Sequence, residues 1–283
     1  MAAPPLHKPG RRLAERLTAL VFYAVSAAVC LIYGKIVFDI ALQGLGELGP
    51  AYLTEAPRHS GRAGGVLPIL VSTLAVLGVA VAAALPVSLA LALFVTEYLP
   101  AGSRAVRLFR ASMLVLASVP SIAFGLFGSS FFAQALGLGT SLLTGGLTLA
   151  VMILPICAFA FEEVFRLLPA GYRSGAYALG AGKARFICRI LIPACAPEIV
   201  TVLLLGSGRA LAETAALMFT SGYSDRMPES LLDPGRVLSI HIYDLAMNIP
   251  GGDTRAAAAA LLLIALFLLI SSAGMFFSTR ARR

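Results

Sequence analysis

Charged residues are scarce in this chain of 283 residues. Asp, Glu, Lys and Arg make up 13% of it, whereas hydrophobic residues make up 59%, and the mean hydropathy is +0.89. A chain this apolar lacks the polar surface that a soluble domain needs. The composition therefore predicts an integral membrane protein. Its apolar runs would cross the bilayer as helices, because a helix satisfies its own backbone hydrogen bonds where no water is present.

Sequence motifs of enzymes and of metal sites are also missing. The four cysteines include no C-x-x-C pair and no spacing suited to zinc, so we interpret them as small packing residues. The absence of H-E-x-x-H, of G-x-S-x-G and of paired aspartates within apolar runs argues against a membrane-embedded protease or acyl transferase. Without a G-x-x-x-x-G-K-[ST] phosphate loop, the chain should not hydrolyse ATP by the usual route. We expect no catalytic residue, no metal and no cofactor of its own.

The positions of the basic residues predict the orientation of the chain. Six apolar spans can be drawn, at about 17–42, 66–97, 107–134, 139–161, 197–219 and 256–277. With the N-terminus in the cytoplasm, fifteen of the 22 basic residues fall on that side, so both termini should be cytoplasmic. This distribution also argues against nucleic acid as a partner. The fifteen are Lys8, Arg11, Arg12, Arg16, Arg104, Arg107, Arg110, Arg166, Arg173, Lys183, Arg185, Arg189, Arg280, Arg282 and Arg283.

The chain leaves no room for a separate soluble domain. Residues 1–64 are expected to hold a cytoplasmic tail, the first span and an external loop, and residues 65–283 a core of five spans. The second span exceeds the ~30 Å hydrocarbon core at ~1.5 Å per residue, so we expect Pro86 to kink it or one end to project. Within the outer loop, residues 237–249 read as a short helix on the surface or dipping inward, with His241 as a surface side chain.

A charged insertion, residues 162–196, separates the fourth and fifth spans. Its apolar positions recur at near-helical spacing, which predicts one helix, a break at Gly180 and a second helix that stops at Pro193. Glycine has no side chain and tolerates unusual dihedral angles, so the break could be pressed closely against another protein. The segment reads as a cytoplasmic elbow. An ordinary loop between two spans is the alternative.

Two charged residues lie four apart in the otherwise apolar fifth span. Arg209 and Glu213 would share a helix face and form an ion pair. A charge within a span costs about 3 kcal/mol on insertion scales, so such residues usually face a wet or protein-lined path. The planar fork of arginine suits a tetrahedral oxyanion, and Glu213 would hold that fork in place. A structural brace between helices is the alternative.

Several segments resemble permeases of ABC importers. The elbow is similar to their EAA loop, E-A-A-x3-G-x9-I-x-L-P: Gly180, Ile190 and Pro193 match, and residues 174–176 read Ser-Gly-Ala where the motif has Glu-Ala-Ala. The segment RALAETAAL at 209–217 resembles R-A-x-G-E-T-A of the phosphate-specific permeases. VPSIAFGLFG at 119–128, ALPVSLALALFVTEYLP at 84–100 and IHIYDLA at 240–246 resemble the same group. The combination points to the PstA branch of that family.

This resemblance implies an all-α integral membrane fold of six transmembrane helices, the type I ABC importer (MetI-like) fold. It implies that the chain forms half of a phosphate path in a bacterial plasma membrane, and that it works with a second, PstC-like permease, a dimeric PstB-like ATPase that binds ATP and Mg, and an external PstS-like phosphate-binding protein. The substrate-path residues would be Arg209, Glu213, Thr214 and Ser121. The ATPase-coupling residues would be Ser174, Gly175, Ala176, Leu179, Gly180, Ala181, Ile190 and Pro193.

Three alternatives to a phosphate permease stay open at this point. A permease for another oxyanion, such as sulfate or molybdate, would share the elbow. A membrane-embedded enzyme would belong to a different class, and the missing motifs argue against it. An autonomous channel would need no ATPase.

Overall fold

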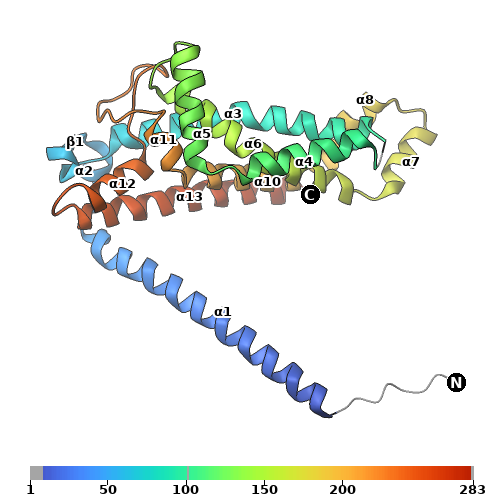
Figure 1. The fold of residues 1–283 in the computed structure, drawn as a ribbon, viewed down its shortest axis with the longest axis horizontal. Coiled ribbons are helices and arrows are strands. Elements are labelled where there is room, and N and C mark those ends of the chain that lie inside the picture. The colour runs from blue at the N-terminus through green and yellow to red at the C-terminus, as the bar shows by residue number, and fades with distance from the viewer. Residues whose placement is uncertain (1–8, 101, 282–283) are drawn as a thin grey trace.

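The computed structural model describes residues 9–100 and 102–281, and most of them are helical (Figure 1). Four described helices are long and apolar enough to cross a membrane: α1 (Pro9–Gly44), α3 (Leu67–Leu93) with its continuation η3 (Phe94–Tyr98), α6 (Leu142–Leu167) and α13 (Asp253–Ala281). Two bent helix pairs bring the number to six if each pair counts as one span. The predicted all-α membrane fold is confirmed.

The shorter elements connect these helices. They are η1 (Leu45–Glu47), α2 (Pro50–Thr54), β1 (Pro57–Arg58), η2 (His59–Gly61), β2 (Ala63–Gly64), α4 (Arg104–Ser118), α5 (Ser121–Gly128), η4 (Ser129–Ala135), α7 (Ala170–Ala178), α8 (Lys183–Phe186), η5 (Ile187–Leu191), α9 (Ile192–Ala194), α10 (Ala196–Leu211), α11 (Ala215–Met218) and α12 (Leu238–Met247). Only β1 and β2 pair as strands in the described part, in a two-stranded antiparallel hairpin.

Helices α3, α6 and α10 form the centre of the bundle. Small residues let α3 and α6 approach closely: Ala80 and Ala84 are buried, and a Cβ at Gly146 would lie 2.5 Å from the Val79 side chain. Larger apolar side chains fill the inner part, among them Ile153, Phe161 and Phe165. Because lipid gives no hydrophobic drive between helices, such close contact of small residues is what holds spans together.

The third span, expected over 107–134, is bent sharply in its middle. Helices α4 and α5 are joined at Val119 and Pro120, and the two halves are bent by 93°. Both residues have extended backbone, since a proline clashes with helical geometry in the residue before it and has no N–H to donate. Helix α5 and η4 therefore stand out across the bundle (Figure 1).

The fifth span is also interrupted. Helix α10 ends at Leu211, residues 212–214 leave the helix, and the one-turn helix α11 follows. The expected span over 197–219 is thus wrong at its C-terminal end, where the Glu213 carboxylate and the Ser239 hydroxyl of α12 bond to the broken backbone instead. At the inner end, the segment Lys183–Ala194 meets α10 at 71°.

The fourth span is longer than the expected 139–161. Helix α6 continues to Leu167, so Glu162, Glu163 and Arg166 belong to the helix and not to the loop that was drawn over 162–196. Glu162 is buried and ion-paired, which is how a charged residue can remain in the helix. The elbow therefore begins only at Leu168.

The short helix expected within residues 237–249 exists as α12 and packs against α13 and α3. His241 is fully buried there, so its expected surface position is wrong. A Cβ at Gly61 would lie 2.6 Å from His241 Cε1, which shows that η2 closes over the histidine. The β1–β2 hairpin, α2 and α12 together form the end of the bundle opposite α7 and α8 (Figure 1).

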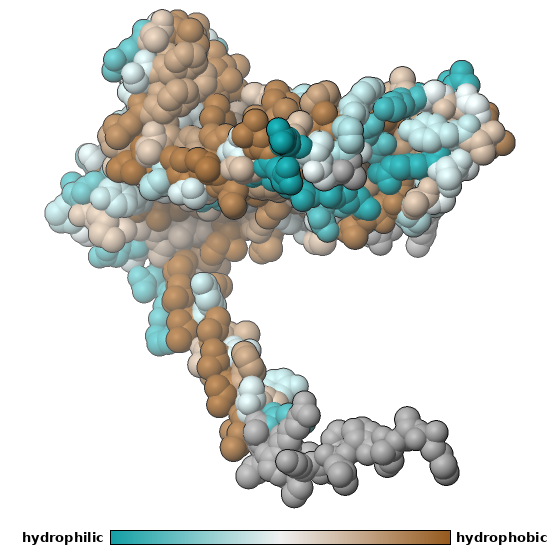
Figure 2. All heavy atoms as spheres, turned by 45° about the vertical axis from the view of Figure 1, so that its right-hand side comes forward, coloured by the Kyte–Doolittle hydropathy of each residue, from teal (hydrophilic) through white to brown (hydrophobic). Residues whose placement is uncertain are grey.

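Helix α1 diverges from the bundle and touches it only near its C-terminal end. A Cβ at Gly44 would lie 2.6 Å from the Ala258 backbone of α13, while none of the most apolar stretch of α1 is buried. Its surface is largely hydrophobic, as is that of α5, whereas hydrophilic residues gather toward the elbow (Figure 2). Among the basic residues used to orient the chain, Lys8, Arg282 and Arg283 lie outside the described residues, as do the side chains of Arg11, Arg12 and Arg280.

Candidate functional site

The predicted ion pair forms at the break in the fifth span. Arg209 Nη1 lies 3.2 Å from Glu213 Oε2. The Arg209 side chain is 43% exposed and that of Glu213 only 5%. The buried Glu213 carboxylate thus pairs with one side of the Arg209 guanidinium, while the rest of that group stays accessible. A guanidinium has five N–H donors, so some remain for a further acceptor.

The break itself depends on Glu213. Its Oε1 accepts a hydrogen bond from the Ala216 backbone N–H at 3.4 Å and so satisfies one free donor at the start of α11. The Glu213 carbonyl oxygen, released from the helix, accepts a bond from Ser239 Oγ of α12 at 2.8 Å. Glu213 therefore pairs with Arg209 and also joins α10, α11 and α12.

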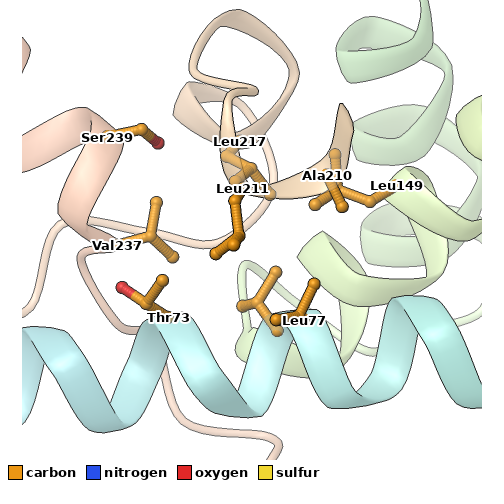
Figure 3. A pocket seen from close by; sticks show the side chains of 9 residues that line it. Thr73, Leu77, Leu149, Ala210, Leu211, Leu217, Val237 and Ser239 are labelled. Atoms are coloured by element: carbon orange, nitrogen blue, oxygen red, sulfur yellow. The ribbon is translucent and has the colours of Figure 1, made fainter. Parts of the chain in front are cut away.

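A small cavity lies just beside this break (Figure 3). Its volume is about 10 Å³, close to the least that holds one water molecule. Its walls come from α3, α6, α10, α11 and α12, and the Ser239 hydroxyl is its main polar group together with Thr73. The lining residues are Thr73, Val76, Leu77, Leu149, Ala210, Leu211, Leu217, Val237 and Ser239. The side chains beside the break are thus almost completely packed.

The other two predicted path residues lie on elements that pack against each other. Thr214 directly precedes α11, and Ser121 opens α5. Helix α5 packs on α11, since a Cβ at Gly125 would lie 2.8 Å from Ala216 Cα. No hydrogen bond joins the Ser121 or Thr214 side chain to Arg209 or Glu213 in the part of the chain that the structure describes. The structure thus places α5 against α11, but it does not join the Ser121 and Thr214 hydroxyl groups to the ion pair.

The predicted elbow is present as two short helices, α7 and α8, with a turn between them. Gly180 has φ of +76°, a left-handed conformation that favours glycine, and a Cβ there would meet no atom within 4 Å. The adjacent Leu179 is 90% exposed. A leucine this exposed beside an unobstructed glycine turn marks the tip of the elbow as the accessible point.

The other residues predicted to contact an ATPase divide between the surface and the interior. Ser174, Gly175 and Pro193 are exposed, whereas Ala181 and Ile190 are half-buried and pack against the core. Ala176 is buried within the elbow, so any contact that it makes with another protein would be through its neighbours.

A charged link that the sequence reasoning missed attaches the elbow to the second span. Arg173 Nε and Nη2 lie 3.1 and 2.6 Å from Glu97 Oε1, and Arg173 Nη2 also donates to the Phe165 carbonyl at 2.9 Å. Lys183 Nζ donates to the Glu97 carbonyl at 3.1 Å and lies over the Tyr98 ring. The signal in the sequence is Glu97, a lone acidic residue at the end of a long apolar run.

The described residues contain no group of three His, Cys, Asp or Glu side chains that could hold a metal ion. The charged groups near the broken span are instead arginine and glutamate. Such a pair suits the binding of an anion better than the coordination of a cation.

The chain matches the family described as "Binding-protein-dependent transport system inner membrane component" over residues 84–283. It belongs to this family. The match covers the second half of α3, both broken spans and the elbow, so it includes the Arg209–Glu213 pair and the Glu97–Arg173 link. The chain is therefore the inner membrane permease subunit of an ABC importer.

Individual relatives of this permease carry more specific names. It is 31% identical to the "Phosphate transport system permease protein PstC" of Haemophilus influenzae, over 69% of this chain and 68% of that one. It is 39% identical to "Phosphate transport system permease protein PstA 1" of Mycobacterium tuberculosis, over 57% of this chain and 53% of that one. A bacterial ABC transporter structure involved in alginate import has a TM-score of 0.64 at 14% identity, covering 95% and 96% of the two chains, which shows the shared fold.

Proposed function

We propose that this permease subunit forms half of an inorganic phosphate path and passes the anion across the membrane when a partner ATPase is driven by ATP. The observation that carries the proposal is Arg209, whose guanidinium is half-exposed at a helix break and is held by the buried Glu213. The phosphate transport systems named among its relatives support the choice of anion.

In this proposal Arg209 binds the anion, and Glu213 keeps its affinity low enough for release. The exposed donors of Arg209 would bind two oxygens of the tetrahedral anion, for which the planar fork is well suited. Glu213 already neutralises part of that charge, so the anion would bind weakly enough to leave again. A path requires moderate affinity, since a tightly held ion is not transported. Thr214 and Ser121 would contribute hydroxyl groups if the anion moves toward α5.

The elbow would receive the motion of the ATPase. Leu179 and Gly180 form the accessible tip, with Ser174, Gly175 and Pro193 exposed nearby, and the Glu97–Arg173 pair joins the elbow to η3. Movement of the tip would therefore shift α3 together with the elbow, and the packing of α3 on α6 and α10 would carry it to Arg209. The result is alternating access of the path to the two sides, with both chain termini in the cytoplasm.

The proposed assembly contains a second, similar permease, two copies of an ATPase that bind ATP and Mg, and an external phosphate-binding protein. The unburied apolar surface of α1 would face lipid or the second permease. Hydrolysis of ATP belongs to the ATPase, and this chain supplies the path and the elbow.

Uptake of labelled phosphate in a strain that lacks the gene tests this function. With Arg209→Gln we expect at least a tenfold loss of uptake while the complex still assembles, and with Arg209→Lys an intermediate rate because lysine lacks the planar fork. Arg58→Gln is the matched control, since Arg58 is an exposed arginine at the outer end, paired with Glu55 at 3.5 Å, and should leave uptake unchanged. Normal phosphate uptake by Arg209→Gln, or a loss of sulfate uptake alone, would contradict the proposal.

A further inference from the structure

A second charged cluster lies near the inner end of α6. Glu162 Oε1 lies 2.8 Å from Arg166 Nη2 of the same helix. It also accepts a hydrogen bond from Arg110 Nε of α4 at 3.0 Å and lies 2.9 Å from Arg110 Nη2. The Glu162 side chain is 4% exposed, whereas those of Arg110 and Arg166 are 46% and 38% exposed. One buried carboxylate oxygen thus holds two half-exposed guanidinium groups side by side.

This cluster has the same construction as the Arg209–Glu213 pair. In each case an arginine and a glutamate lie four apart in the chain, the carboxylate is buried, and the guanidinium keeps an accessible edge. The difference is the additional arginine from α4. The inner cluster therefore presents two guanidinium groups to an incoming group where the outer pair presents one.

The cluster contains more positive than negative charge. A brace between α4 and α6 would need only one arginine for one glutamate, because a single pair is already neutral. The second arginine leaves the cluster with a net charge of +1 in a span, which is costly unless an anion or water compensates it. Each guanidinium has five N–H donors, and the bonds to Glu162 use only some of them.

The cluster lies closer to the cytoplasmic side than Arg209 does. Glu162 is five residues before the end of α6 at the elbow, about 8 Å along the helix axis. Arg209 is thirteen residues from the inner end of α10, about 20 Å along that helix. An anion that leaves Arg209 for the cytoplasm would approach the level of Arg110 and Arg166 next.

We propose that Arg110 and Arg166, held by Glu162, form an inner binding site for a phosphate group. The inference rests on the proposed function for free phosphate, which would use the site on leaving the path. The phosphate of an anionic lipid headgroup has the same chemistry, and it is the other source that the experiment must separate. In both cases the two guanidinium groups bind oxygens of one phosphate, and Glu162 limits the affinity.

The test uses proteoliposomes that contain the whole importer, with ATP inside and binding protein outside, so that the lumen corresponds to the cytoplasm. Uptake of labelled phosphate is measured over a range of unlabelled luminal phosphate. In the unaltered complex, luminal phosphate should slow uptake by occupying the inner site. Arg110→Gln and Arg166→Gln should raise the inhibitory concentration about tenfold, whereas Glu162→Gln should lower it, because the competing carboxylate charge is lost.

The opposite effects of the arginine and glutamate variants distinguish a binding site from a brace. If all three variants only reduce assembly alike and the effect of luminal phosphate stays the same, the cluster is a brace and the proposal is overturned. No effect of luminal phosphate on the unaltered complex, and no effect of anionic lipid, would overturn it as well. Arg107→Gln, an exposed arginine one turn earlier on α4, is the control and should behave as the unaltered protein does.

A second set of vesicles separates the two sources of phosphate. The same complexes are placed in phosphatidylcholine alone and in phosphatidylcholine with phosphatidylglycerol. If uptake depends on phosphatidylglycerol through Arg110 and Arg166 but not on luminal phosphate, the site binds a lipid phosphate. If the unaltered vesicles take up no phosphate at all, the proposed function fails, whereas normal uptake without either dependence removes only the inner site.

Discussion

At the scale of single residues, the molecule uses buried carboxylates to position exposed arginines. Glu97, Glu162 and Glu213 are each nearly inaccessible, and each bonds to one or two arginines that retain an accessible edge. A glutamate can be buried in this way only when its charge is paired. The sequence predicted the Arg209–Glu213 pair from their spacing, because residues four apart in a helix would share a face. It could not predict Glu97–Arg173 or Arg110–Glu162, because their members lie 76 and 52 residues apart.

The protonation of His241 links the stability of the fold to pH. Burial, and secondly the charge of Arg236, lower the pKa of His241 from 6.5 to about 3. Its Nδ1 has no hydrogen-bond partner among the described residues. Asp225 and Asp244 lie 3.1 and 3.8 Å from Arg236 Nε, and the 3.1 Å contact is electrostatic because the atoms are not aligned for a hydrogen bond. Burial raises the pKa of Asp225. Protonation of Asp225 in acid therefore favours the folded state, whereas protonation of His241 favours the unfolded one.

We therefore expect the outer loop to lose stability in acid through His241. The folded histidine stays neutral, while the unfolded one takes up a proton below its pKa of 6.5, so lowering the pH favours unfolding. Between pH 7 and pH 5 the loss is about 2 kcal/mol. Thermal unfolding of the purified protein in detergent at both pH values measures it. His241→Gln should show a smaller decrease between the two, and an equal decrease in both proteins would contradict the buried neutral histidine.

At the scale of elements, the sequence predicted where apolar segments lie better than where they break. Hydropathy gave the long helices α3, α6 and α13, because their residues are apolar on every side. The breaks at Pro120 and at residues 212–214 interrupt runs of similar hydropathy, and they depend on contacts such as the Ser239 bond to the Glu213 carbonyl. The two helices of the elbow and the break at Gly180 were predictable, because charged residues, a glycine and prolines interrupt the apolar pattern there.

The link between the elbow and the second span gives a prediction at this scale. Glu97→Gln removes the charge that holds Arg173, and breaking a buried pair costs about 3–5 kcal/mol. Motion of the elbow would then no longer reach α3, so ATP hydrolysis by the assembled complex should persist while phosphate uptake decreases at least tenfold. The measurement is the ratio of phosphate transported to ATP hydrolysed in proteoliposomes.

The charge-exchanged double variant Glu97→Arg with Arg173→Glu is the control for that prediction. It restores the ion pair with the two charges exchanged, so the ratio of phosphate transported to ATP hydrolysed should partly recover. If Glu97→Gln keeps the normal ratio, or if both variants lose uptake and ATP hydrolysis together because the complex falls apart, the link does not transmit motion.

At the scale of the whole molecule, the described chain is one part of a larger assembly. Most of α1 packs on none of the described residues, α5 and η4 project from the bundle with exposed Phe127 and Phe131, and the elbow ends in the exposed Leu179. Large exposed apolar surfaces of this kind lie against lipid or other subunits. The membership of the importer permease family agrees with this, since such a permease works with an ATPase and a binding protein.

Transport by proteoliposomes with and without the ATPase subunit tests the central claim most directly. Vesicles that contain both permeases and the ATPase, with binding protein outside, should take up labelled phosphate only when ATP is present in the lumen. Vesicles that contain this chain alone should take up none, with or without ATP. Phosphate uptake by the purified chain alone, independent of ATP, would contradict the account.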